Sequence, residues 1–135
     1  MSIGQAFADV RDFHITFGHP APDVPSLQHA ERAHTRGEWI ESEVEELREA
    51  ATIADQADAY IDIIYFALGG LVELGINPAR LWRIVHAANM AKRQPDGTVK
   101  RREDGKIIKP DDWVAPDAAL RAEIDDQIAR ASWGR

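Results

Sequence analysis

The sequence predicts an all-α protein, a bundle of four to five helices with a short hairpin or irregular segment towards its C-terminal end. Apolar residues recur every three or four positions over most of the 135 residues, which is the period of an amphipathic helix. Glycine and proline interrupt this pattern at a few points, where the helices are expected to end. Because we find no internal repeat, linker or low-complexity stretch, we expect one domain over residues 1–135.

A proline-rich loop separates the first two helices. The spacing of apolar residues predicts a helix over about residues 2–17, and Gly18 should end it. Residues 19–25 include three prolines and cannot continue a helix. Ser26 is the expected N-cap of the second helix, which should run to about residue 51.

The third helix is expected over about residues 55–74, with Gly75 closing it. It is apolar on most sides after Tyr60, so it should be the central element of the bundle. A fourth helix is expected from Pro78, since proline suits the first helical position, to about Arg93.

The segment after the fourth helix combines turn residues with a basic charge. Asp-Gly pairs at residues 96–97 and 104–105 flank short strand-like runs, so a hairpin is expected before a last helix that begins near Asp117. Residues 92–109 hold seven basic and three acidic side chains, a net charge of +4; since the whole chain carries −7, the remainder carries −11. Such a chain can bind a metal ion and a polyanion together, although a solvated charged loop explains the composition equally well.

The bulk composition limits the classes of function. The chain is 44% hydrophobic and 29% charged, which is ordinary for a globular protein, and its negative charge argues against a general nucleic-acid binder. Cysteine is absent, which excludes disulfides, thiolate metal sites and cysteine nucleophiles. The longest apolar run contains Asp62 and is too short to span a membrane. The N-terminus has no signal-peptide pattern, so we expect a cytoplasmic protein.

Two helices each carry a pair of carboxylates on one face. Glu43 and Glu46 are three residues apart in the second helix, and Asp58 and Asp62 are four apart in the third. If the two helices pack antiparallel through a short turn, the two pairs face each other. Like charges held this close repel, and a divalent cation removes that penalty. Ligands that are all oxygen suit Mg²⁺ or Mn²⁺, which typically bridge to substrate phosphates.

A simpler explanation exists for each helix taken alone. The acidic run from Glu41 to Glu49 is typical of a solvent-facing helix surface. Asp62 would be costly to bury unpaired, but a Tyr or Trp donor or an arginine could satisfy it. The conjunction of the two helices is harder to explain as surface and favours a metal site.

The chain resembles the all-α nucleoside triphosphate pyrophosphohydrolases, the MazG-like and phosphoribosyl-ATP pyrophosphohydrolase-like superfamily, over about residues 5–117. Its members carry a Glu-Glu-x-x-Glu helix followed by a helix with Glu-x-x-Asp. The matching segments here are Ser42-Glu43-Val44-Glu45-Glu46-Leu47 and Asp58-Ala59-Tyr60-Ile61-Asp62, and the segments at residues 85–92 and 104–110 resemble the signature of a bacterial and viral subgroup. Two departures are that Ser42 replaces the usual first Glu and that the second motif is Asp-x-x-x-Asp.

The resemblance implies a metal-dependent enzyme that hydrolyses a nucleoside triphosphate to the monophosphate and pyrophosphate, by attack of water at the α-phosphate. It implies that Mg²⁺ or Mn²⁺ is bound by four carboxylates, those of Glu43, Glu46, Asp58 and Asp62. Glu43 or Glu46 would serve as the catalytic base that takes the proton of the water.

Four residues of the later segment are implied as substrate ligands: Asn89, Lys92, Lys106 and Lys109. For the three lysines, a surface role is equally consistent with the sequence. The resemblance further implies a homodimer or homotetramer, with the site near the subunit boundary. Neither a nucleic acid nor a membrane is expected as a partner. Two other functions stay open, a phosphoribosyl-ATP pyrophosphohydrolase with the same fold and a non-catalytic helical dimerisation module.

The tryptophans and His14 are expected to be structural. Trp39, Trp82 and Trp113 could stack on a base, but core or interface positions are expected for them. His14 should be a half-buried histidine with satisfied hydrogen bonds rather than a metal ligand.

Overall fold

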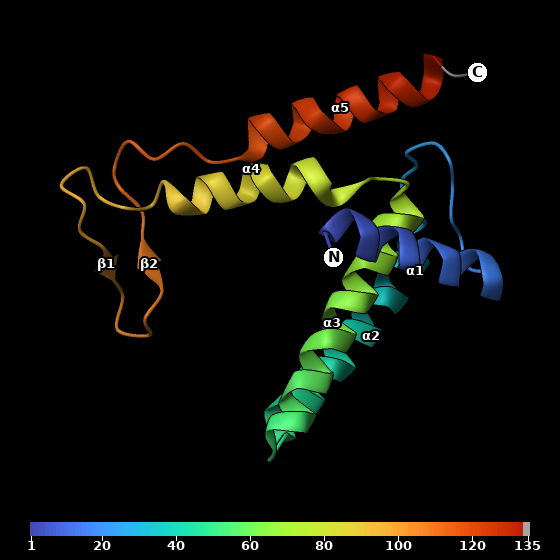
Figure 1. Cartoon of the computed structure of the whole chain (residues 1–135), viewed down its shortest axis with the longest axis horizontal. Coiled ribbons are helices and arrows are strands. Elements are labelled where there is room, and N and C mark those ends of the chain that lie inside the picture. The colour runs from blue at the N-terminus through green and yellow to red at the C-terminus, as the bar shows by residue number, and fades with distance from the viewer. Residues whose placement is uncertain (134–135) are drawn as a thin grey trace. The chain divides into compact units, whose positions relative to one another are not determined.

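The computed structural model describes residues 1–133, which form five α-helices and one two-stranded sheet in the order α1, α2, α3, α4, β1, β2, α5 (Figure 1). The predicted all-α class with a small hairpin is therefore confirmed. The chain divides into two compact units. The first holds residues 1–78 together with the end of α5 from Ile128, and the second holds residues 79–127. No helix within residues 1–133 is both long enough and apolar enough to cross a membrane.

Helix α1 spans Ile3–Phe17, close to its predicted bounds. The Ser2 hydroxyl accepts a hydrogen bond from the backbone N–H of Gln5 at 3.2 Å, which satisfies a donor that the first turn leaves unpaired. Gly18 ends the helix with φ of +75°, and its N–H donates to the carbonyl of His14.

Helix α2 spans Ala30–Glu49, so the predicted N-cap at Ser26 is wrong. The Ser26 hydroxyl instead donates to the carbonyl of Val24 at 2.9 Å. Its backbone N–H donates to the carbonyl of Leu74, also at 2.9 Å. These bonds hold the preceding segment against the C-terminal end of the third helix, and α2 begins only after it, with His29 at the N-cap position.

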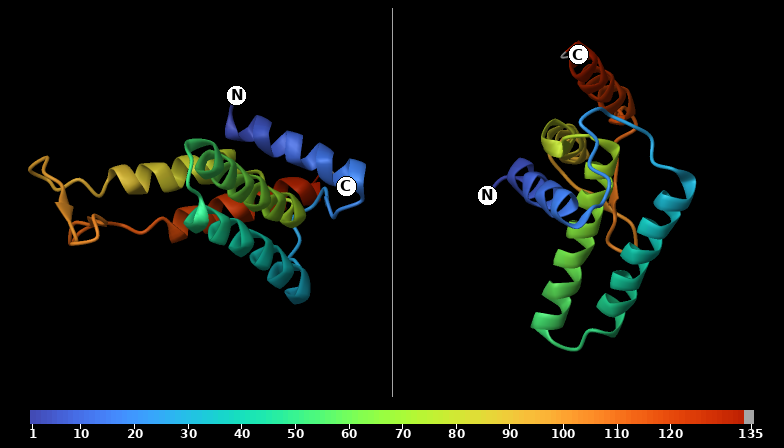
Figure 2. Two further views of the ribbon diagram at one scale, coloured as in Figure 1. Left: turned by 90° about the horizontal axis from the view of Figure 1, so that it is seen from below. Right: turned by 90° about the vertical axis from the view of Figure 1, so that its right-hand side faces the viewer.

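Helix α3 spans Ile53–Leu74 and lies side by side with α2, running in the opposite direction (Figure 2). Thr52 caps it by accepting a hydrogen bond from the N–H of Asp55 at 3.1 Å. Gly75 ends it with φ of +69°, and a Cβ at that position would lie 3.0 Å from the carbonyl oxygen of Val24. Both the backbone conformation and the packing of the loop therefore require glycine there.

The core of the first unit is small and lies between α1 and α3. Its buried members are Val10, Leu68 and Val72. Helix α3 packs against both α1 and α2, as predicted for the central element, but its apolar face is not covered by the single chain, because Tyr60 is 57% exposed and Ile61 is 60% exposed. This apolar face of α3 remains open, and Asp62 beside it is half-buried.

The second unit contains most of the remaining elements. Helix α4 spans Pro78–Met90 and ends about one turn before the predicted Arg93. The predicted hairpin is present as β1, Lys100–Arg101, paired antiparallel with β2, Ile107–Ile108. Helix α5, Asp117–Trp133, begins where the sequence predicts it.

Candidate functional site

Where α2 and α3 lie side by side, three carboxylates lie within electrostatic reach of Glu43. We call Glu43 and Glu46 of α2, with Asp58 and Asp62 of α3, the acidic cluster. The pKa of Glu43 is raised above its ordinary value of 4.5, first because its carboxyl group loses hydration. The negative charges of Glu46, Asp62 and Asp58 raise this pKa further. The antiparallel packing of the two helices therefore brings Glu46, Asp58 and Asp62 within electrostatic reach of Glu43.

One carboxylate oxygen of the acidic cluster is orphaned. Oε2 of Glu43 is shielded from solvent and has no hydrogen-bond partner within residues 1–133. A buried oxygen without a donor costs free energy, so such an atom calls for an explanation. No lysine, arginine or histidine of the described chain forms an ion pair with any of the four carboxylates. Carboxylate oxygens are the groups that Mg²⁺ and Mn²⁺ prefer, so the four residues are of the right kind for the predicted metal site.

The side chains of the acidic cluster do not converge on one point as the ligands of a bound metal ion would. In the part of the chain that the structure describes, no three histidine, aspartate or glutamate groups are close enough to hold a metal ion. Glu46 and Asp58 are exposed, so rotation about their side-chain bonds can move their oxygens without moving the backbone. Ser42, which replaces the usual first Glu, donates its hydroxyl to the carbonyl of Trp39 at 2.9 Å. The role of the four residues as metal ligands stays a prediction.

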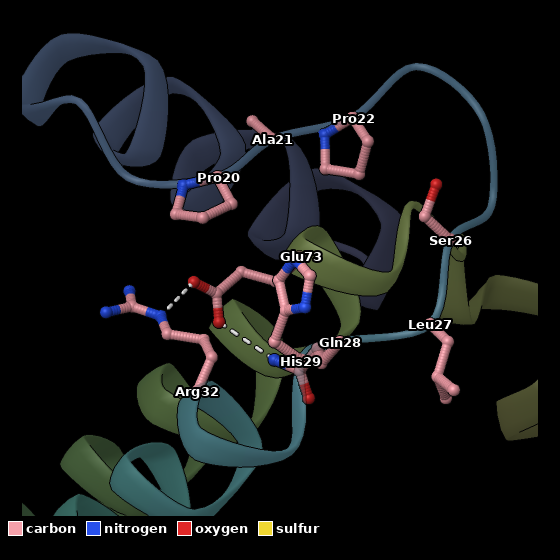
Figure 3. A pocket seen from close by; sticks show the side chains of 9 residues that line it. All are labelled: Pro20, Ala21, Pro22, Ser26, Leu27, Gln28, His29, Arg32 and Glu73. Carbon is pink, nitrogen blue, oxygen red and sulfur yellow. Dashed lines mark hydrogen bonds and ion pairs between the residues drawn. The ribbon is translucent and has the colours of Figure 1, made fainter.

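A second cluster, at the other end of the same two helices, pairs its carboxylate with cations. The side chain of Glu73 is 1% exposed. Its Oε1 accepts a hydrogen bond from Arg32 Nε at 2.7 Å, and its Oε2 lies 3.1 Å from Arg36 Nε. Gln28 Nε2 donates to Oε2 at 2.9 Å (Figure 3). We call these four residues the Glu73 cluster.

Arg36 is held in place from several sides. Its Nη2 donates to the carbonyl of Phe66 at 2.9 Å, and its guanidinium lies 5.3 Å from the ring centroid of Trp39. A Cβ at Gly69 would collide with this guanidinium, so glycine leaves the room that Arg36 occupies. Burial lowers the pKa of Arg36, and the charge of Glu73 opposes that shift.

The sequence contains a pattern that could have revealed the Glu73 cluster. Glu73 lies within the apolar C-terminal half of α3, as Asp62 lies within its middle. Arg32 and Arg36 are four residues apart on α2 and therefore share a face. A carboxylate in an apolar helix needs a partner, and this requirement is stricter for the buried Glu73 than for the half-buried Asp62.

Two cavities lie along the α2–α3 pair. The larger, of about 440 Å³, borders the Glu73 cluster and is lined by Pro20, Ala21, Pro22, Ser26, Leu27, Gln28, His29, Arg32 and Glu73 (Figure 3). Glu73 is eleven residues from Asp62, and Arg32 is eleven from Glu43, a distance of about 16 Å along each helix axis. The larger cavity is therefore remote from the acidic cluster. The smaller, of about 220 Å³, involves residues only one helical turn away from that cluster.

The predicted substrate ligands belong to α4 and the hairpin region. Lys92 Nζ and Lys109 Nζ lie 5.6 Å and 4.7 Å from the ring centroid of Trp113, so the structure brings these two ammonium groups to one indole. The indole N–H donates to the carbonyl of Ala88 at 2.7 Å, which fixes the ring. Lys106 lies in the hairpin turn, where its backbone N–H donates to Asp104.

Asn89 is exposed near the end of α4. Its carbonyl accepts a hydrogen bond from the backbone N–H of Lys92 at 3.1 Å. Of the other residues expected to be structural, Trp82 is 60% exposed and is no core residue of this chain. His14 is buried and its Nδ1 lies 2.8 Å from the carbonyl oxygen of Pro20, so the expected satisfied histidine is present.

Comparisons with known proteins agree with this architecture. Residues 10–89 match the sequence family described as phosphoribosyl-ATP pyrophosphohydrolase. A solved structure from Exiguobacterium sp. 255-15, named as a candidate NTP pyrophosphohydrolase, is 31% identical in sequence with a TM-score of 0.53. The alignment covers 93% of this chain and 96% of that one. The comparison with curated proteins gave no match.

Proposed function

Since the chain belongs to the phosphoribosyl-ATP pyrophosphohydrolase family, within the MazG-like superfamily, we propose that it hydrolyses a nucleoside triphosphate with the help of a divalent cation. The family makes it a pyrophosphohydrolase, a hydrolase that acts on a phosphoric anhydride. The finer proposal is that water attacks the α-phosphate and that the products are a nucleoside monophosphate and pyrophosphate.

The surroundings of the Glu43 carboxyl group are the observation that supports metal-dependent hydrolysis. Its Oε2 is shielded from water and unpaired, and three neighbouring carboxylates raise its pKa. A protein that kept this arrangement for stability alone would place a cation beside it, as the same helices do at Glu73. An acidic cluster without a counter-charge is instead suited to a cation that arrives from solution with the substrate phosphates.

The remaining chemistry is assigned to residues of this chain. Mg²⁺ or Mn²⁺, when bound by the acidic cluster, would supply charge neutralisation at the phosphates and acidify the attacking water. Glu43 or Glu46 would accept the proton of that water, and no covalent nucleophile is needed. Lys92 and Lys109, whose ammonium groups both lie close to the indole of Trp113, are the residues we assign to the triphosphate oxygens. Asn89 and Lys106 would add further donors to the sugar or phosphates.

The second candidate substrate is phosphoribosyl-ATP, and the observation that favours it is the description of the matching family. Phosphoribosyl-ATP has the same anhydride as a nucleoside triphosphate, so the acidic cluster would serve both. The departure of the second motif, Asp58-x-x-x-Asp62 in place of Glu-x-x-Asp, favours the simpler nucleotides.

The open face of α3 supports a proposal about assembly. Tyr60, Ile61 and Ile64 are each more than half exposed, although large apolar side chains of this kind are usually covered. We propose a homodimer or homotetramer that covers this face, which would bring a second copy next to the acidic cluster.

A panel of substrates tests the proposed reaction. Canonical nucleoside and deoxynucleoside triphosphates and phosphoribosyl-ATP are incubated with Mg²⁺ or Mn²⁺, and pyrophosphate and phosphate are measured separately. We expect pyrophosphate and a monophosphate in equal amounts, and no turnover with a chelator. Release of single phosphate groups would contradict the proposal, and cleavage of phosphoribosyl-ATP alone would favour the second substrate.

A further inference from the structure

The indole of Trp113 caps the C-terminal end of α4. In a continuing helix, the carbonyl of Ala88 would accept the backbone N–H of Lys92, four residues later. That N–H donates instead to the carbonyl of Asn89, at 3.1 Å, because the helix ends here. The indole N–H of Trp113 takes its place and donates to the carbonyl of Ala88 at 2.7 Å. A side chain 25 residues further along the chain therefore supplies the hydrogen bond that the helix end lacks.

A backbone turn brings the same indole next to Lys109. The backbone N–H of Trp113 donates to the carbonyl of Pro110 at 3.1 Å, and Pro110 is buried, so the chain just after Lys109 is fixed. Lys109 Nζ lies 4.7 Å from the ring centroid of Trp113, and Lys92 Nζ lies 5.6 Å from it. Two hydrogen bonds thus anchor Trp113, one through its ring and one through its backbone, and its indole is a fixed surface for both ammonium groups.

The two ammonium groups share a ring but have no anion between them. The electrons of the indole attract each cation, whereas two positive charges near one ring repel each other. In the part of the chain that the structure describes, neither Lys92 nor Lys109 forms an ion pair with a carboxylate. The segment 92–109 carries a net charge of +4, so its other side chains do not balance this charge. An anion with several negative charges would therefore be attracted by both ammonium groups.

We propose that Trp113 is a positioning residue, which holds Lys92 and Lys109 ready for the phosphates of the substrate. A lysine side chain that is free in solvent samples many rotamers, and ordering it on binding costs free energy. The indole restricts this freedom before the ligand arrives, so less is lost when the ammonium groups donate to phosphate oxygens. Trp113 acts through the two lysines and needs no contact with the substrate. This inference rests on the proposed function for the identity of the ligand, whereas the contacts of the indole are independent of it.

Two substitutions of Trp113 separate its aromatic face from its hydrogen bond. Trp113→Phe keeps an aromatic face but lacks the indole N–H, and Trp113→Leu lacks both. The Kd of inorganic tripolyphosphate is measured by nuclear magnetic resonance titration without a divalent cation, so that the acidic cluster does not contribute to binding. Trp113→Leu should raise this Kd by about fivefold to hundredfold, the range for two lysines that must be ordered on binding. Trp113→Phe should raise it by less than about threefold. Equal increases in the two variants would show that Trp113 acts only by capping α4, and would overturn the proposal.

Lysine substitutions test whether the two ammonium groups depend on the ring. Lys92→Met and Lys109→Met should each raise the Kd of tripolyphosphate in the parent and have a smaller effect in Trp113→Leu. Lys100→Met is the matched control, because Lys100 is exposed in β1 and is not one of the two cations at the ring. It should change the Kd by less than about threefold in both backgrounds. Effects of Lys92→Met and Lys109→Met that are as large in Trp113→Leu as in the parent would contradict a positioning role.

One measurement on the parent needs no substitution and serves if Trp113→Leu unfolds, as judged by circular dichroism. The ε protons of Lys92 and Lys109 should give nuclear Overhauser contacts with the indole protons of Trp113, and their resonances should move when tripolyphosphate is added. Absence of these contacts would overturn the proposal.

Turnover separates this inference from the proposed function. If nucleoside triphosphates release pyrophosphate, Trp113→Leu should raise KM by more than it lowers kcat. Pyrophosphate release with the parent KM in Trp113→Leu would overturn the inference and leave the reaction assignment intact. If no nucleotide releases pyrophosphate while the binding of tripolyphosphate still depends on the ring of Trp113, the reaction assignment is wrong and the positioning role stands.

Discussion

The two ends of the α2–α3 pair hold carboxylates in opposite surroundings. At one end, Glu73 is almost completely buried and is contacted by Arg32 and Arg36. At the other, the four carboxylates of the acidic cluster have no cation of the described chain beside them, and the pKa of Glu43 is raised. Within the described chain, the same two helices therefore build one cluster whose carboxylate is paired with cations and one whose carboxylates are not.

The presence of cations at the Glu73 cluster and their absence, within residues 1–133, at the acidic cluster indicate a structural role for the first and a functional role for the second. Removing one partner from a buried ion pair leaves an uncompensated charge, so the Glu73 cluster should matter for stability. Removing one member of a set of like charges relieves repulsion, so the acidic cluster should matter for activity and little for folding.

The largest effect is expected for Asp62→Ala. Turnover should fall by more than about a hundredfold, because the transition-state charge then loses part of its metal site. The thermal midpoint should be unchanged or higher. Initial rates of pyrophosphate release and circular dichroism measure the two quantities. Glu45→Ala is the control, since Glu45 is exposed on α2 and pairs with Arg48 outside the acidic cluster. A parent-like rate in Asp62→Ala would remove the acidic cluster from the mechanism.

Glu73→Ala should lower the free energy of unfolding by about 3–5 kcal/mol, because it leaves two guanidinium groups without their carboxylate. Urea denaturation of the metal-free protein measures the change. Asp58→Ala deletes a carboxylate of the same helix α3 and should cost less than about 0.5 kcal/mol. Similar losses in the two variants would mean that the two ends do not differ as described.

Gly69→Ala should destabilise the protein by about 1–3 kcal/mol, because the added methyl group displaces Arg36 from Glu73. Gly70→Ala is the neighbouring control. A Cβ there would lie 3.9 Å from Arg36 Nε, an ordinary contact, and replacing a helical glycine should stabilise the protein by about 0.5–1 kcal/mol. Thermal unfolding of the two variants should therefore shift in opposite directions, and a shift of Gly69→Ala towards higher temperature would contradict the tight packing around Arg36.

The smallest effect is a pH dependence caused by Glu43. Because its pKa is raised in the folded state, the folded protein retains a proton that the unfolded chain has lost, and stability falls as pH rises from 4.5 through the raised pKa. Glu43→Gln removes this penalty. With a chelator present, the thermal midpoint of Glu43→Gln relative to the parent should increase between about pH 4.5 and pH 7. A difference that stays constant over this range would show that Glu46, Asp58 and Asp62 do not repel Glu43.

Much of the fold follows from short-range features of the sequence. Gly18 and Gly75 end α1 and α3 as predicted, because each adopts a positive φ that other residues rarely tolerate. The Asp-Gly pairs mark the hairpin. The start of α2 was missed because Ser26 is held by the carbonyl of Leu74, a contact between residues that are distant in sequence.

Burial was harder to predict than secondary structure. The apolar run of α3 suggested an enclosed Asp62, but apolar composition does not say whether the same chain or a second copy covers a helix face. The pairing of Glu73 with Arg36 depends on the room left by Gly69, which no local pattern shows. The positions of the four residues of the acidic cluster could be predicted from the sequence, because helical spacing places each pair on one helix face and a short antiparallel turn brings the two faces together.

Uptake of Mn²⁺ tests the central claim most directly. The chelator-treated protein is titrated with Mn²⁺ and bound ion is followed by electron paramagnetic resonance, beside Asp62→Ala and Glu45→Ala. We predict saturable binding to the parent and to Glu45→Ala, and an affinity at least about tenfold weaker in Asp62→Ala. Absence of bound Mn²⁺ at millimolar concentration, or equal uptake by all three proteins, would contradict a cation site between α2 and α3.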